Sequence, residues 1–124
     1  MALAEMQNGR KRGHWIWFVF PKMKGLGFSV TSRTYSISSL DEAKAYLAHP
    51  VLGERLRKIT SVILSHKGRR AEYLMGGPLD SLTLKSSMTL FDAASPNDIF
   101  AKVLEFFFNG ERCVDTLDKL GIEY

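Results

Sequence analysis

The sequence predicts a mainly α-helical fold, a compact single-domain bundle of about five to seven short helices. Three observations predict it. Apolar residues recur at spacings of three and four in several stretches, start and stop signals separate these stretches, and 124 residues is the usual length of one domain. A small α+β arrangement is the alternative, because Trp15–Phe20 and Arg33–Ser38 could each form a strand.

The first third of the chain combines a short helix with a segment that is basic and then aromatic. Ala2–Gln7 suits a short helix that the following Asn-Gly pair can end. Arg10–Gly13 is a basic linker, and Trp15–Phe20 is an unbroken apolar run closed by Pro21. Periodicity does not distinguish a buried strand from a buried helical turn in so short a run.

Two helices are expected on either side of a His-Pro pair. Ser39–Glu42 is a capping box, in which the serine hydroxyl caps the helix and Glu42 reaches back; it opens a helix through Ala48. Pro50 breaks that helix and starts a second one, which runs to about Ser65. The apolar stripe of the second helix has spacings of four, three and four, at Leu52, Leu56, Ile59 and Ile63.

Three more helices are expected in the second half. Asp80 is expected to cap a helix over Ser81–Ala94. Ser95 is expected to cap the next helix, which the Asn-Gly pair at 109–110 ends. A last, short helix is expected near Asp115–Leu120, whereas Ala71–Met75 is a short segment of unassigned structure that Gly-Gly-Pro at 76–78 ends.

The positive charge is concentrated near the start of the chain. The net charge is +4. Residues 1–37 carry six basic side chains and one acidic one, whereas the other 87 residues carry eleven basic and twelve acidic. A local basic field attracts phosphates, nucleotides, nucleic acid or acidic proteins. The alternative is a merely solvated basic turn.

Several function classes have no sequence signal. The one cysteine, Cys113, excludes an internal disulfide, and a reducing, cytoplasmic location is expected. No apolar run is long enough to span a membrane. The chain has no zinc spacing, no phosphate-binding glycine loop and no Gly-x-Ser-x-Gly motif, so no metal and no cofactor is expected.

The first candidate site is the segment Arg10-Lys-Arg-Gly-His-Trp. Arginine forks fit phosphate or carboxylate oxygens, so Arg10 and Arg12 are candidate ligand-binding residues. His14 could bind a ligand or act as a general acid or base, and Trp15 could stack on a ring. The alternative is that the tryptophans belong to the core and the arginines are solvated.

The second candidate site lies on the expected helix over Ser81–Ala94. Lys85, Ser86 and Thr89 could hold an anion, and Arg112 is a further candidate beside Cys113. The alternative is an ordinary polar face, with an intrahelical Lys85–Asp92 pair or hydroxyl-to-backbone hydrogen bonds. Cys113 itself is more readily read as a small apolar residue than as a nucleophile.

Four segments resemble the bacterial domain-of-unknown-function family 1810. They are Gly9–Pro21 followed by Gly-Leu-Gly at 25–27, Ser39–Leu56, Leu79–Phe91 with its Leu-Lys-Ser-Ser-Met-Thr-Leu-Phe, and Phe107–Leu117. The resemblance implies a compact, mainly helical domain with no established activity. Some members carry the label calpastatin, although a compact domain differs from that disordered protease inhibitor.

The chain departs from the family pattern in three places. Family members usually have a further helix of the Asp-Leu-x-Arg-Phe type before the position of Ala2, a serine at the position of Gly13 and a glutamine at the position of Lys22. We expect one domain over residues 1–124 that lacks this first helix, as a monomer or a homodimer.

Three functions remain open at this point. The first is a domain of unknown function that binds a small anionic ligand, in which Arg12, His14, Lys85 and Ser86 converge on one pocket. The second is a protein-interaction or inhibitor-like module without catalysis. The third, nucleic-acid binding, is not favoured, because the chain matches no common nucleic-acid motif.

Overall fold

The computed structural model describes residues 2–13, 15–23 and 36–122, and its regular structure is helical. The helices are α1 (Ala2–Gln7), α2 (Ile16–Val19), α4 (Leu40–Ala48), α5 (Leu52–Ser65), α6 (Ala71–Met75), α7 (Pro78–Ala94), α8 (Ile99–Phe108) and α9 (Val114–Leu120). The predicted mainly α fold is confirmed. None of the helices in these ranges is long and apolar enough to cross a membrane.

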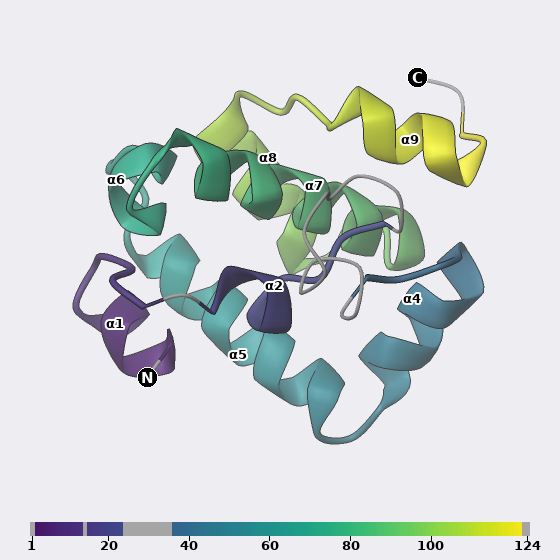
Figure 1. Ribbon diagram of the computed structural model, residues 1–124, viewed down its shortest axis with the longest axis horizontal. Helices are drawn as coiled ribbons and strands as arrows, with labels where there is room; N and C mark the ends of the chain where they lie inside the picture. The colour runs from purple at the N-terminus through teal and green to yellow at the C-terminus, as the bar shows by residue number, and fades with distance from the viewer. Residues whose placement is uncertain (1, 14, 24–35, 123–124) are drawn as a thin grey trace.

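Helix α7 is the centre of the bundle. It packs against α2, α4, α6, α8 and α9, while α5 packs against α1, α4 and α8. In Figure 1, α7 crosses the middle of the molecule with α8 behind it, α6 at the left and α9 at the upper right. The core is built around Phe91 of α7, whose ring lies 5.4 Å from that of Tyr46 and 5.7 Å from that of Phe100.

Because α7 is covered on most sides, it buries hydroxyl groups as well as apolar ones. Every residue from Ser86 to Phe91 is buried. Ser86 and Thr89 donate hydrogen bonds to backbone carbonyls one turn earlier, at 3.0 and 2.8 Å. Such bonds satisfy a buried hydroxyl within its own helix. The hydroxyl of Ser87 is buried, and no described residue forms a hydrogen bond with it.

The α4–α5 corner forms largely as the sequence predicts. The backbone N–H of Glu42 donates to the Ser39 hydroxyl at 3.1 Å, and the Glu42 carboxylate accepts from the N–H of Ser38 at 2.8 Å, so the capping box is confirmed. Helix α5 begins at Leu52 rather than at Pro50. The reason is His49, whose Nδ1 accepts from the backbone N–H groups of Val51 and Leu52 and ends the turn between the helices.

Gly53 sets how closely α4 and α5 approach. A Cβ atom at this position would lie 2.0 Å from the carbonyl oxygen of Leu47. Any side chain would therefore force the two helices apart. The same close approach places the start of α5 beneath the end of α4 and orients the apolar stripe Leu56, Ile59 and Ile63 toward the core.

Two further predicted helix starts are wrong. Helix α7 begins at Pro78 with Gly77 as its N-cap, so Asp80 lies inside the first turn instead of capping it. Helix α8 begins at Ile99, and its cap is Asp98, which accepts from the Ile99 N–H at 2.7 Å. Ser95 instead donates to the Asp98 carboxylate at 2.8 Å. It therefore stabilises the capping side chain but is not itself the N-cap.

Asp98 also joins two helices. Arg57 of α5 donates to its carboxylate at 2.6 Å and lies over the Phe100 ring. Although burial raises the pKa of Asp98, the hydrogen bonds from Arg57, the Ile99 N–H and Ser95 outweigh it and hold that pKa below its ordinary value. The cap of α8 is therefore fixed to α5.

The two candidate strands have different outcomes. The run Trp15–Phe20 contains the short helix α2, so the strand alternative is wrong there. The run Arg33–Ser38 lies half outside the described residues. Within them, Ile37 forms an isolated bridge with Met23, and its N–H donates to the carbonyl of Lys22 at 2.9 Å.

Candidate functional site

The basic segment after α1 is fixed to α6 and to the first turn of α7. The Arg10 N–H donates to the carbonyl of Glu5 at 3.1 Å, and the Lys11 N–H donates to the carbonyl of Leu74 at 2.6 Å. The Lys11 ammonium is buried and lies 2.7 Å from the Asp80 carboxylate. The segment therefore runs along α6 with a defined backbone position.

Glu5 organises the next few residues. Its carboxylate accepts from the N–H groups of Arg12 at 2.6 Å and Gly13 at 2.7 Å, and from the indole N–H of Trp15 at 2.9 Å. The bonds from Gly13, Arg12 and Trp15, in that order, lower the pKa of Glu5 from 4.5 to about 2. These three N–H donors are therefore bound to a carboxylate of the protein itself and are not directed at a ligand.

The side chain of Arg10 meets a second basic segment. The guanidinium carbon of Arg10 lies 5.1 Å from the centroid of the Tyr73 ring, and that of Arg69 lies 5.9 Å from the same centroid. Cations over an aromatic face at this range are attracted by the ring. The fold therefore brings the linker after α1 and the turn before α6 together on one tyrosine.

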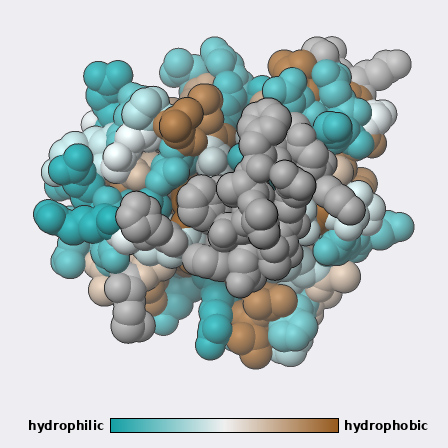
Figure 2. Space-filling view, in the orientation of Figure 1, coloured by the Kyte–Doolittle hydropathy of each residue, from teal (hydrophilic) through white to brown (hydrophobic). Residues whose placement is uncertain are grey.

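The same turn contacts a second exposed ring. The Lys67 ammonium lies 5.0 Å from the centroid of Phe106 on α8. We define the basic corner as Arg10, Lys67 and Arg69 with the rings of Tyr73 and Phe106. The left edge of the molecule in Figure 2, where α6 and the segment after α1 lie, is strongly hydrophilic.

The three cations of the basic corner have no acidic partner. Within the described ranges, Arg10, Lys67 and Arg69 make no ion pair, whereas Arg70 beside them is paired with Glu72 at 3.0 Å. All three are exposed. Their charge is therefore directed to solvent and not neutralised by the protein.

His66 links two of the elements next to the basic corner. Its Nε2 lies 2.7 Å from the carbonyl oxygen of Met6, which connects α1 to the end of α5. This contact occupies the Nε2 atom of the histidine. His14, the expected acid or base, lies outside the described residues.

The second group of predicted site residues forms a different contact. Lys85 is paired with Glu111 at 3.3 Å, and Arg112 with Asp92 at 3.1 Å. In the alternative interpretation as a polar face, the Lys85–Asp92 pair is wrong, because each partner is paired with the segment before α9. The hydroxyl-to-backbone hydrogen bonds of that interpretation are confirmed at Ser86 and Thr89.

The hydroxyls of α7 complete this contact. The Thr89 hydroxyl accepts from the Cys113 N–H at 2.9 Å, and the Ser86 hydroxyl lies 3.3 Å from the Cys113 sulfur. Lys85, Ser86, Thr89 and Arg112 thus fasten residues 111–113 onto α7. Their polar atoms are used by the protein itself.

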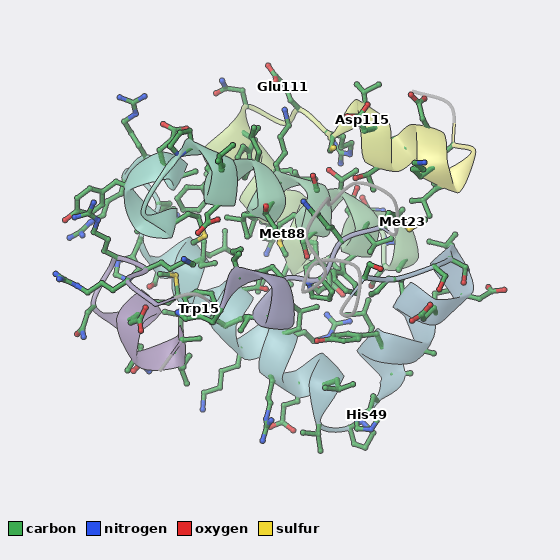
Figure 3. All side chains as sticks on the ribbon, viewed as in Figure 1. Trp15, Met23, His49, Met88, Glu111 and Asp115 are labelled. Carbon is green, nitrogen blue, oxygen red and sulfur yellow. The ribbon has the colours of Figure 1, made fainter. Side chains whose placement is uncertain are left out.

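The structure does not bring the two groups into one pocket. Trp15 and Glu111, the partner of Lys85, lie on different sides of the molecule in Figure 3. Arg12 is exposed and contributes its backbone N–H to Glu5, while Trp15 packs its ring 6.3 Å from that of Phe20. Arg10 alone of the predicted residues belongs to the basic corner.

Comparison with known proteins identifies the family. The sequence profile of the family described as "Protein of unknown function (DUF1810)" matches residues 1–120. The chain belongs to the DUF1810 family. The crystal structure of a conserved hypothetical protein from Mycobacterium tuberculosis is similar to it, with a TM-score of 0.93 and 44% identity over 98% of this chain and 87% of that chain. No curated protein matches.

This DUF1810 chain has a half-buried lysine, Lys22, in the segment after α2. Lys22 makes no hydrogen bond or ion pair with its side chain in the part of the chain that the structure describes. Burial lowers its pKa, and the neighbouring Cys113 and Asp80 oppose that shift. The described residues contain no group of three His, Cys, Asp or Glu side chains suited to a metal ion.

Sequence reasoning missed four of the five residues of the basic corner in this DUF1810 protein. The turn His66–Arg70 is visible in the sequence as a basic run. Its proximity to Arg10 depends on the packing of α1 against α5, which no local pattern encodes. Tyr73 and Phe106 carry no signal besides being aromatic residues at exposed positions, 50% and 49% exposed.

Proposed function

We propose that this protein binds an anionic ligand bearing phosphate or carboxylate groups at the basic corner. The observation that carries the proposal is that Arg10 and Arg69 share the Tyr73 ring, while neither has an acidic partner among the residues that the structure describes. The ring limits the freedom of both side chains before a ligand arrives. Less ordering entropy is then lost on binding.

The chemistry of arginine suits this arrangement. A guanidinium group over an aromatic ring keeps its N–H donors at its edge, where they fit two oxygens of one phosphate or carboxylate. Hydrogen bonds to charged groups contribute about 1.5–3 kcal/mol each. Removing either arginine should therefore weaken binding about tenfold or more.

The test is a thermal-shift screen followed by calorimetry. We expect pyrophosphate and ADP to raise the melting temperature, since a ligand of the native state stabilises it. Arg10→Ala and Arg69→Ala should each abolish most of the shift. Arg55→Ala removes the same charge from the exposed face of α5 and should leave the shift unchanged. No shift at saturating anion, or an equal loss in the control, would refute the proposal.

A protein-interaction role is the second candidate. Leu79 and Leu82, on the first turns of α7, are 77% and 58% exposed. Figure 2 shows a hydrophobic patch over this part of α7. Adjacent exposed apolar side chains mark interaction sites more often than isolated ones do. Sedimentation tests the case of self-association: Leu79→Ser should lower the association constant, and a monomer at every concentration would count against it.

A further inference from the structure

We infer that the ligand of the basic corner is a single-stranded nucleic acid. The inference rests on the proposed function and names the ligand class of the same surface. It goes further because a lone phosphate would use Arg10 and Arg69 only, whereas the corner continues through Lys67 to the ring of Phe106.

The spacing of the cations suits a chain of charges. The distances of 5.1 and 5.9 Å to one ring centroid place the two guanidinium carbons no more than about 11 Å apart. Neighbouring phosphates of one strand lie within that range, so each arginine can contact a different phosphate. Lys67 lies two residues before Arg69 in the sequence and provides a third cation in the same turn.

The exposed rings separate a nucleic acid from a simple polyanion. Phe106 has no polar atom and is 49% exposed beside Lys67, so it offers nothing to a phosphate. It does offer a face to a base. Single strands bind surfaces on which cations follow the backbone while aromatic side chains stack on bases. Tyr73, 50% exposed, is the second such ring.

The recognition would be tolerant of sequence. The chain matches no common nucleic-acid module, and contacts to phosphates together with stacking on aromatic rings carry little sequence information. Charge and stacking therefore account for the binding, and affinity should fall with salt. Three neutralised phosphates correspond to a slope of log K against log salt of about −2 for a single strand.

The experiment measures fluorescence anisotropy of labelled twelve-residue oligo(U) and oligo(dT), with unlabelled inorganic polyphosphate as competitor. We expect both oligonucleotides to bind with a salt slope near −2. Arg10→Ala and Arg69→Ala should each make the slope shallower by about 0.7. Phe106→Ala should weaken binding about tenfold with the slope unchanged, because it removes stacking and no charge.

The control variant is Val51→Ala, which trims an exposed apolar side chain in the turn between α4 and α5; it should not change the affinity. Polyphosphate that competes as strongly as oligo(U), with Phe106→Ala binding normally, would overturn the inference. So would failure of both oligonucleotides to bind while ADP still binds through Arg10, and that result would leave the proposed function standing. Failure of every anion would remove both.

Discussion

Lys11 and Asp80 form an ion pair of 2.7 Å that joins the linker after α1 to the first turn of α7. The lysine side chain is 7% exposed and the aspartate 28%. Lys11 therefore differs from the exposed arginines of its segment, because its charge is buried and paired with Asp80. The pair positions the backbone from which Arg10 reaches Tyr73.

Removing the lysine should destabilise the protein. Lys11→Met leaves Asp80 without its cation, and breaking a buried pair costs about 3–5 kcal/mol. Since Asp80 is partly solvated, we expect a loss of about 1–3 kcal/mol in the free energy of unfolding. Urea denaturation measures it. In the double variant Lys11→Met, Asp80→Asn, part of the loss should return; a purely additive result would show that the pair is not coupled.

Acid should weaken the N-terminal segment through Glu5. The folded pKa of about 2 lies below the ordinary value of 4.5. A lowered pKa gives stability that is present above the unfolded value and is lost as the pH falls from about 4.5 toward about 2. Glu5→Gln should lower the melting temperature at pH 7 and flatten its fall between pH 5 and pH 2.5.

The control for Glu5 is Glu105→Gln on the exposed face of α8. It should leave both the neutral melting temperature and its acid dependence close to those of the natural chain. An identical acid profile for Glu5→Gln and the natural chain would mean that the three N–H donors do not depend on the ionised carboxylate.

Gly53 should not tolerate alanine. A glycine-to-alanine change inside a helix ordinarily stabilises by about 1 kcal/mol. Here the new Cβ would lie 2.0 Å from the Leu47 carbonyl oxygen, so we expect the opposite sign and a loss of more than about 2 kcal/mol. Ser61→Ala, at an exposed position of the same helix, should be neutral or slightly stabilising. Thermal unfolding of the two variants compares them directly.

Two neighbouring hydroxyls of α7 should respond differently to removal. The Ser87 hydroxyl is buried without a partner, so Ser87→Ala should be neutral or stabilise by up to about 1 kcal/mol. The Thr89 hydroxyl accepts from the Cys113 N–H, so Thr89→Val should cost about 1–2 kcal/mol. Denaturation midpoints would contradict this if the two variants shifted in the same direction by similar amounts.

Local patterns predicted the helices well where the residues that decide an end are adjacent in sequence. The cap at Ser39 and the short helix near Asp115–Leu120 are confirmed. The sequence predicts Asp80 as a cap because aspartate is a good capping residue, but Pro78 already supplies a favourable first position and Asp80 is paired with Lys11. A contact from outside the helix decided that end.

The candidate site was less predictable for the same reason. The excess of positive charge over residues 1–37 points to Arg10, which makes no ion pair within the described residues. Its partners, Arg69 and Tyr73, are about sixty residues away in the chain. Lys85 and Arg112 looked equally free in the sequence, yet acidic residues on the facing segment neutralise them. Only tertiary packing separates the two cases.

The central position of α7 implies that the molecule opens unevenly. Amide hydrogens in the buried stretch of α7 should exchange with solvent only when the whole fold is lost, since neighbours cover it on most sides. The basic corner rests on peripheral elements, the six-residue α1 and the five-residue α6. Amide hydrogens of these two short helices should therefore exchange through local opening, at a lower free energy than those of α7.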